Sequence, residues 1–218
     1  PEKPGQKADP LKEAALAAKL PVYQPASYRK PEVWEEFRAL KPDLQVMAFV
    51  TLFVPEDFLN IPTHGSIQYH PSLLPAYRGA APINWAIING ERETGVTTFF
   101  IKHEIDTGNI ILQEKELIHD HDNVGTLYER LMLKGANLVV KTVEAIRDDL
   151  YTLKEQKEFE CTQHAPKLYK ETCEIDWTLS SKEVYDFIRG LSPYPAAWTK
   201  FHDKTYKIFD SSISTISM

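Results

Sequence analysis

Two side chains that could form a proton-transfer pair each follow an apolar segment of this chain. His70 comes directly after residues 66–69, and Asp106 follows residues 96–101 at the start of a Gly turn. Because reactive groups gather beyond the carboxyl ends of strands in α/β sheets, the two side chains can meet in space. Such a pair suits acyl-type transfer, in which a nucleophile loses a proton and a tetrahedral oxyanion needs a donor. We expect His70 to stabilise the oxyanion, and Asp106 to orient His70 and help to receive the proton.

A purely structural role for both residues is the alternative. His70 could satisfy a buried polar group, and Asp106 could cap the turn at Thr107 and Gly108, as Asp often does. No competing nucleophile is evident, because Ser72 has no G-x-S-x-G elbow and the chain has no Gly-rich phosphate loop. The spacing of the residues alone leaves the catalytic and the structural interpretation open.

Alternating helix and strand signals predict how these side chains are positioned. Helices are expected over residues 11–20, 31–40, 55–59 and 82–89, and strands over residues 44–50, 66–69, 96–101 and 110–118, with a short strand at residues 22–24. Residues 123–150 predict one long helix or a helix broken at Gly135. The pattern indicates an α/β fold with a Rossmann-like, mostly parallel sheet.

The character of the chain changes after residue 150, where it becomes polar and rich in Lys and Glu. We expect a catalytic domain over residues 1–155 and a linker over residues 156–179. Ser180 and Glu183 have the spacing of a capping box ahead of a helix at residues 184–190, and residues 198–213 alternate like a β-hairpin. Residues 180–218 are therefore expected to begin a second, β-rich domain. With no initiator Met, the chain is expected to be truncated at both ends and to lack the first strand and helix of its catalytic domain.

Composition excludes several classes of protein. The net charge of −6 argues against a broad basic surface for nucleic acid, and no apolar run has membrane-spanning length. Cys161 and Cys173 have neither zinc-site nor disulfide-framework spacing, so we expect reduced thiols and a cytoplasmic location.

A short acidic and His-rich segment, His119–Asp122, could be mistaken for a metal site. Its place just before a predicted helix favours a solvated turn in which Asp122 or Asn123 is the N-cap. We expect no metal in this protein.

The residues around His70 and Asp106 also carry a long family resemblance. Residues 70–90 (HPSLLPAYRGAAPINWAIING), residues 94–98 (TGVTT) and residues 104–108 (EIDTG) closely resemble the methionyl-tRNA formyltransferase family. The similarity extends from residues 1–4 through residues 164–168 to residues 187–198, so that it covers nearly the whole chain.

This resemblance implies a Rossmann-like catalytic domain and an oligonucleotide-barrel-like C-terminal domain. It further implies formyltetrahydrofolate as formyl donor and the amino group of methionyl-tRNA as acceptor, in the initiation of translation. The family's catalytic His and Asp fall on His70 and Asp106, and Gln68 takes the position of a second oxyanion donor. The implied folate site comprises Phe49, Leu52, Phe53, Pro55, Ile101, Lys102, His103 and Glu104, together with Ser72, Leu73, Leu74 and Pro75.

Three positions depart from the family pattern. Gln68 stands where Asn is usual, Ala76 stands where Arg is usual, and residues 5–9 replace a longer basic loop. Residues 5–10 and 65–70 look more like the hydrolase domain of formyltetrahydrofolate dehydrogenase, in which water is the acceptor. Folate hydrolysis, formylation of a sugar-nucleotide amine, and binding without turnover are therefore the alternatives. We expect a monomer that does not associate with membranes.

Overall fold

A computed structural model describes residues 10–48, 54–102, 104–157 and 163–214. No helix in these ranges is both long and apolar enough to cross a membrane. The elements in chain order are α1 (Pro10–Ala17), α2 (Pro31–Ala39), β1 (Gln45–Met47), α3 (Glu56–Leu59), β2 (Ser66–His70), β3 (Arg78–Gly79), α4 (Pro82–Ile88), β4 (Glu93–Phe100), β5 (Ile110–Leu117), α5 (Val124–Arg147), β6 (His164–Ala165), η2 (Glu171–Cys173), α6 (Ser181–Leu191), β7 (Ala197–Phe201) and β8 (Lys204–Ile208).

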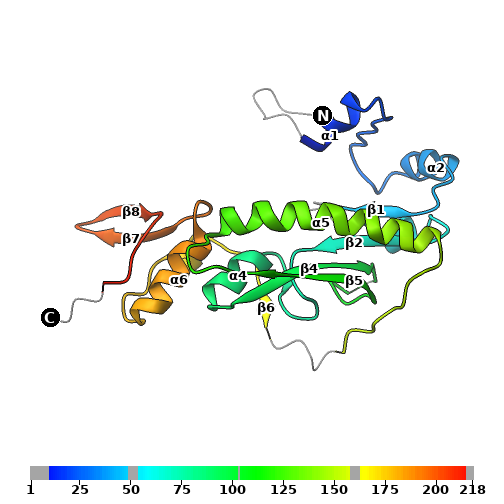
Figure 1. Ribbon diagram of the computed structural model, residues 1–218. Helices are drawn as coiled ribbons and strands as arrows, with labels where there is room; N and C mark the ends of the chain where they lie inside the picture. The colour runs from blue at the N-terminus through cyan, green and yellow to red at the C-terminus, as the bar shows by residue number, and fades with distance from the viewer. Residues whose placement is uncertain (1–9, 49–53, 103, 158–162, 215–218) are drawn as a thin grey trace.

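The main sheet has the strand order β1-β2-β4-β5 (Figure 1). The predicted α/β class is confirmed. The parallel pairing expected for the sheet holds between β1 and β2, whereas β4 runs antiparallel to both β2 and β5. The short connection from β4 to β5 explains the second antiparallel pair, because parallel neighbours need a crossover of a dozen or more residues. The turn that carries Asp106 is therefore the connection of a hairpin, not of a crossover.

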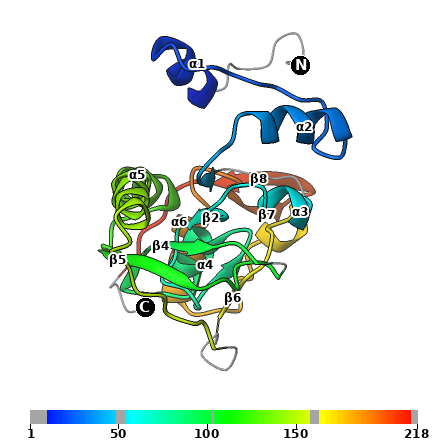
Figure 2. The same cartoon turned by 90° about the vertical axis from the view of Figure 1, so that its right-hand side faces the viewer.

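Helix α5 runs along one face of the sheet (Figures 1 and 2). Ile67 packs in a cluster with Ile146 of α5, and the Tyr69 hydroxyl donates to the Leu131 carbonyl over 3.2 Å. Because side chains alternate along a strand, the residues between and after these two, Gln68 and His70, lie on the opposite face of β2. Packing of Ile67 and Tyr69 against α5 thus leaves Gln68 and His70 on the face of β2 that can carry a site.

Gly135 does not interrupt α5, which is one continuous helix. The ring of Tyr69 lies against Gly135 so closely that a Cβ at this position would overlap its atoms. The glycine therefore allows the helix to approach the sheet, and of the two alternatives the single long helix is confirmed.

The turn before α5 is capped as the sequence predicts. The Asn123 side chain accepts from the Thr126 amide, and the Thr126 side chain completes a capping box. Asp122 is buried and forms two hydrogen bonds with Arg130, at 2.7 and 2.6 Å. The His119 and His121 rings stack on each other.

The N-terminal helices lie apart from the main sheet in the view of Figure 2. The strand expected at residues 22–24 is not formed; prolines on both sides of this segment remove ladder donors. Residues 22–24 instead line a pocket near Phe58. Phe58 is the centre of an aromatic cluster formed by Tyr28, Trp34 and Phe37.

The C-terminal part begins with α6, whose predicted capping box between Ser180 and Glu183 is confirmed. The predicted hairpin is also confirmed, as β7 and β8 pair antiparallel. A second apolar cluster joins these elements, and its buried residues are Cys173, Ile175, Ile188, Leu191, Ala197 and Trp198. Cys161 lies outside the described residues, whereas Cys173 is a buried free thiol.

Candidate active site

The structure brings His70 and Asp106 together. His70 is the last residue of β2, opposite Thr97 of β4, and Asp106 lies in the turn between β4 and β5. The His70 Nδ1 atom lies 3.7 Å from Asp106 Oδ2, and the two side chains are only 4% and 5% exposed. This distance is too long for a hydrogen bond; the contact is an ion pair when the imidazole is protonated, and its burial shields it from water.

A further contact defines the orientation of the His70 ring. His70 Nε2 lies 2.9 Å from the carbonyl oxygen of Tyr77. Because a carbonyl only accepts, Nε2 carries a hydrogen in this arrangement, and Nδ1 is the nitrogen that faces Asp106. The Nε2 hydrogen of His70 therefore points to the Tyr77 carbonyl oxygen. It is available to an oxyanion, which is a stronger acceptor than this carbonyl.

Tyr77 is held firmly where it meets His70. Its backbone has a positive φ of 61°, and its buried hydroxyl donates to Glu91 Oε1 over 2.7 Å and accepts from Asn89 over 3.2 Å. Burial and the hydrogen bond to Glu91 raise the pKa of the Tyr77 hydroxyl far above its usual range. Tyr77 therefore stays neutral and acts as a fixed anchor for the carbonyl that contacts His70.

The carboxylate of Asp106 has its own backbone donor. The amide of Gly79 donates to Asp106 Oδ2 over 3.0 Å. Gly79 has a φ of 125° and pairs with Ala165 of β6, so closely that a Cβ would overlap the Ala165 carbonyl. Only glycine can adopt this φ and lie this close to Ala165. Pairing with β6 therefore positions the Gly79 amide that donates to Asp106.

Gln156 supports the same turn from the segment after α5. Its Nε2 donates to the carbonyls of Asp106 and Gly108, over 2.9 and 2.7 Å, and its Oε1 accepts from Nε and Nη2 of Arg78, over 3.1 and 2.9 Å. The segment is itself fixed by two backbone hydrogen bonds between Ile110 and Lys154. Sequence reasoning missed Gln156, because a Gln in a polar stretch carries no local signal of such contacts.

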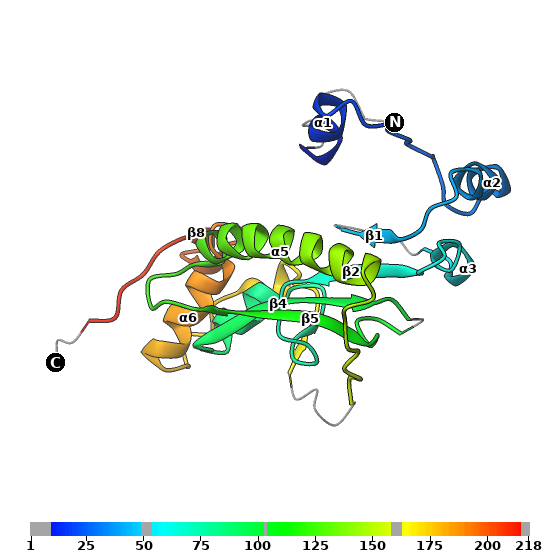
Figure 3. The same cartoon turned by 45° about the vertical axis from the view of Figure 1, so that its right-hand side comes forward.

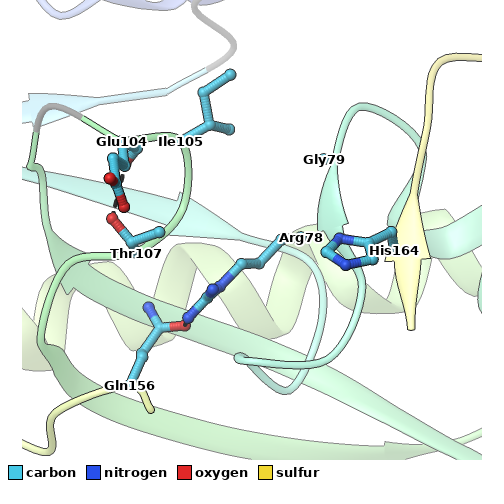
Figure 4. Close-up of a pocket in the computed structure, with 7 residues that line it drawn as sticks. All are labelled: Arg78, Gly79, Glu104, Ile105, Thr107, Gln156 and His164. Atoms are coloured by element: carbon cyan, nitrogen blue, oxygen red, sulfur yellow. Dashed lines mark hydrogen bonds between the residues drawn. The ribbon is translucent and has the colours of Figure 1, made fainter. Parts of the chain in front are cut away.

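A cavity of about 380 Å³ opens beside the Asp106 turn. Figure 4 shows the Arg78 side chain extending toward Gln156, with His164 on the far side of Arg78. The lining residues are Arg78, Gly79, Glu104, Ile105, Thr107, Gln156 and His164. Glu104 is the one member of the predicted folate site, within the described ranges, that lines this cavity. Figure 3 shows that the chain leaving α5 runs past the strands of the main sheet.

The predicted binding residues Ser72 to Pro75 lie in a loop held against β4. The Thr97 hydroxyl donates to the Ser72 carbonyl over 2.6 Å and accepts from the Leu74 amide over 3.2 Å. Gln113 donates to the Leu74 carbonyl over 2.8 Å. Leu73 and Pro75 are half-buried, and Leu74 is fully buried. The loop is thus held to the sheet by hydrogen bonds, and it follows directly from His70.

The other predicted site residues are dispersed. Gln68 is half-buried and lies on the same face of β2 as His70. Pro55 caps α3, and the Ile101 amide donates to the Ser66 carbonyl. Lys102 is exposed and donates to Asn109 over 3.2 Å. The remaining members lie outside the described residues; they are Phe49, Leu52, Phe53 and His103.

Curated relatives share much of this sequence. A methionyl-tRNA formyltransferase of Azobacteroides pseudotrichonymphae is 49% identical over 195 residues, which cover 88% of this chain and 60% of the relative. A methionyl-tRNA formyltransferase of Bacteroides fragilis is 46% identical over 224 residues, which cover 97% of this chain and 69% of the relative. The chain thus spans about 60% of the length of the first of these relatives.

Solved structures show the same fold at low sequence identity. HypX from Aquifex aeolicus in complex with tetrahydrofolic acid has a TM-score of 0.68 at 23% identity, over 83% of this chain and 31% of that chain. The N-formyltransferase from Helicobacter canadensis, in complex with folinic acid and dTDP-3-aminofucose, has a TM-score of 0.71 at 22% identity, over 94% of this chain and 72% of that chain.

Two family models match the chain. The model described as formyl transferase matches residues 2–143, and the model described as formyl transferase, C-terminal domain, matches residues 167–217. Because the first match alone covers more than half of the chain, the protein belongs to the formyl transferase family.

Proposed function

We propose that the full-length protein transfers a formyl group from formyltetrahydrofolate to the amino group of methionyl-tRNA, the formylation step of translation initiation. The observation that carries this proposal is the buried contact between His70 and Asp106, whose neighbours Ile105 and Thr107 line a cavity. The two relatives described above bear the name methionyl-tRNA formyltransferase, and their identity to this chain supports the choice of acceptor.

The site residues divide the work of acyl transfer between them. The amine nitrogen attacks the formyl carbon, and the carbonyl oxygen becomes an oxyanion. The His70 Nε2 hydrogen leaves the Tyr77 carbonyl for this oxyanion, because an anionic oxygen is a stronger acceptor than a neutral one. Asp106 orients the ring from the Nδ1 side and receives the proton that the amine loses. Collapse of the oxyanion breaks the bond between carbon and the folate nitrogen, and the leaving nitrogen takes up the proton that Asp106 received, which returns Asp106 to its carboxylate form.

We propose that the folate donor uses the cavity beside the Asp106 turn and the loop that follows His70. The cavity volume lies at the lower end of the range typical of small-molecule sites. One structural neighbour holds tetrahydrofolic acid, which fits a folate ligand for this fold. Gln68, on the His70 face of β2, is proposed as the second donor to the oxyanion. No step of this chemistry requires a metal.

The proposal also covers the domain boundaries of the chain and its location in the cell. We propose a catalytic domain over residues 1–155, a linker over residues 156–179 and a C-terminal domain that begins at residue 180. Since translation takes place in the cytoplasm, we place the protein there, as a monomer without membrane association.

A sugar amine is the second candidate acceptor, because one neighbour of the same fold holds dTDP-3-aminofucose. Water is the third, as in folate hydrolysis. The test is an assay of the full-length protein with formyltetrahydrofolate and one of three conditions: methionyl-tRNA, a nucleotide-linked amino sugar, or no acceptor. Tetrahydrofolate release that depends on methionyl-tRNA and equals the formylmethionyl-tRNA formed is the expected result. Equal release without any acceptor would identify a hydrolase and overturn the proposal.

A further inference from the structure

We propose that Gln156 is a positioning residue for the reaction, which acts by holding the Asp106 turn so that its carboxylate faces His70. This inference rests on the proposed function and assigns a role to a residue outside the expected catalytic domain. Gln156 is 9% exposed, and both ends of its amide are used.

The contacts of Gln156 close a ring around Asp106. Gln156 donates to the Asp106 carbonyl and accepts from Arg78, while Gly79, next to Arg78 in the chain, donates to the Asp106 carboxylate. Gln156, Arg78 and Gly79 are thus linked to one another, and together they hold both the backbone and the side chain of Asp106. Movement of the turn relative to β3 would break contacts on both sides of this ring.

The turn needs this support because its backbone is unfavourable. Asp106 has a φ of 56°, in the left-handed region, which is unfavourable for a residue with a Cβ. Asp106 and Gly108 are both buried, and a buried carbonyl without a donor also costs free energy. Gln156 satisfies both carbonyls at once, so that it stabilises the strained conformation in which the carboxylate meets His70.

The chemistry of the contacts selects an amide. The two carbonyls need N–H donors, whereas the Arg78 guanidinium needs an acceptor, and one Gln side chain offers both. A Glu at this position would keep the contact with Arg78 but place a carboxylate against two carbonyl oxygens. A Leu would fill a similar volume and make neither contact.

The test compares Gln156→Leu and Gln156→Glu with the unchanged full-length protein in steady-state formyl transfer. We expect kcat to fall about 10- to 100-fold in both variants, as for a small misplacement of a catalytic group. KM for the formyl donor should change less than about threefold, because both ends of the Gln156 amide are bonded to protein groups although the residue lines the cavity. Gln45→Leu is the matched control, because Gln45 is a half-buried Gln of the same sheet whose side chain bonds to Ser66 and Met47 and not to the turn. It should leave kcat unchanged.

A double-mutant cycle distinguishes positioning from general structural damage. If Gln156 acts through Asp106, adding Gln156→Leu to Asp106→Asn costs little further activity, since residues that act as a unit are not additive. Losses that multiply, or a kcat for Gln156→Leu equal to that of Gln45→Leu, would overturn the inference.

A crystal structure of Gln156→Leu tests the geometry without relying on activity. We expect the Asp106 carboxylate to leave ion-pair distance of His70. If the turn is in the same position in Gln156→Leu, the role of Gln156 is rejected, whether or not the protein formylates any acceptor. If the protein without substitutions shows no formyl transfer, only the proposed function is rejected.

Discussion

The side chains of His70 and Asp106 lie 3.7 Å apart, and each is held there by residues from other parts of the chain. His70 is aimed by β2, whose alternate residues are fixed against α5, and its ring is held by the Tyr77 carbonyl. Asp106 is held by Gly79 and by Gln156, which come from two other segments. The contact between His70 and Asp106 therefore depends on several elements of the fold. A substitution in any of these elements can test it.

The carboxylate charge of Asp106 is the first feature to test. In Asp106→Asn the amide oxygen can still accept from Gly79, so the turn should keep its shape, but proton removal and orientation of His70 are weakened. We expect kcat for formyl transfer to fall about 10²- to 10³-fold with a nearly unchanged melting temperature. Asp176→Asn, at an exposed turn with Thr178, is the control and should retain full activity. A rate within threefold of the unchanged protein would mean that Asp106 has no catalytic role.

Gly79 should tolerate no side chain. In Gly79→Ala the new Cβ meets the Ala165 carbonyl, and the backbone must also hold a φ of 125°. We expect a loss of about 2–4 kcal/mol in the free energy of unfolding by urea, together with lower activity, because the donor to Asp106 is displaced. Gly65→Ala is the matched control: its φ is 74°, but nothing lies within 4 Å of the added Cβ. It should cost only about 1 kcal/mol. Equal costs for the two variants would show that the contact with β6 is unimportant.

Gly135 offers a case in which packing opposes helix propensity. Ala is favoured over Gly inside a helix by about 1 kcal/mol, yet a Cβ at Gly135 overlaps the Tyr69 ring. We expect Gly135→Ala to lower the free energy of unfolding by about 1–3 kcal/mol. In a Tyr69→Val background the ring is gone, and the same change should become neutral or stabilising. If Gly135→Ala stabilises the protein that retains Tyr69, the close approach of α5 to β2 is incorrect.

The elements with strong local signals could be predicted from the sequence. The capping box at Ser180 and Glu183 and the N-cap at Asn123 involve contacts over three residues, so the pattern alone reveals them. Prolines also occupy the first turn of α2 and α4, which is a local signal of a helix start. The antiparallel course of β4 could not be predicted from alternation, because pairing direction depends on which strands become neighbours.

The candidate site was predictable only in part, for the same reason. His70 and Asp106 stand out because each follows an apolar strand, and the structure places them in contact. Gln156 and His164 reach the cavity from a polar segment that has no periodic pattern. Their positions depend on the Ile110 and Lys154 bridge and on β3 pairing with β6, which are long-range contacts without a local sequence signal.

The contact between Asp122 and Arg130 predicts a dependence of stability on pH. Burial alone would raise the pKa of Asp122, but hydrogen bonds from Arg130, from the His119 amide and from Thr126 outweigh it and lower this pKa from 3.8 to about 2. A carboxyl whose pKa is lower in the folded state stabilises the protein above its unfolded pKa, and this contribution disappears as the pH falls through the folded pKa. The stabilisation, about 2 kcal/mol, should therefore be complete above about pH 5 and be lost between about pH 4 and pH 2.

The measurement is the free energy of unfolding by urea from pH 7 to pH 2, for the unchanged protein and for Asp122→Asn. The variant should be less stable at pH 7, and the difference should shrink toward pH 2, because Asn has no charge to lose. Asp148→Asn removes a surface carboxyl that pairs with Arg147 in the open, and it should change stability little at any pH. A difference between Asp122→Asn and the unchanged protein that is the same at pH 7 and pH 2 would show that the charge of Asp122 does not stabilise the start of α5.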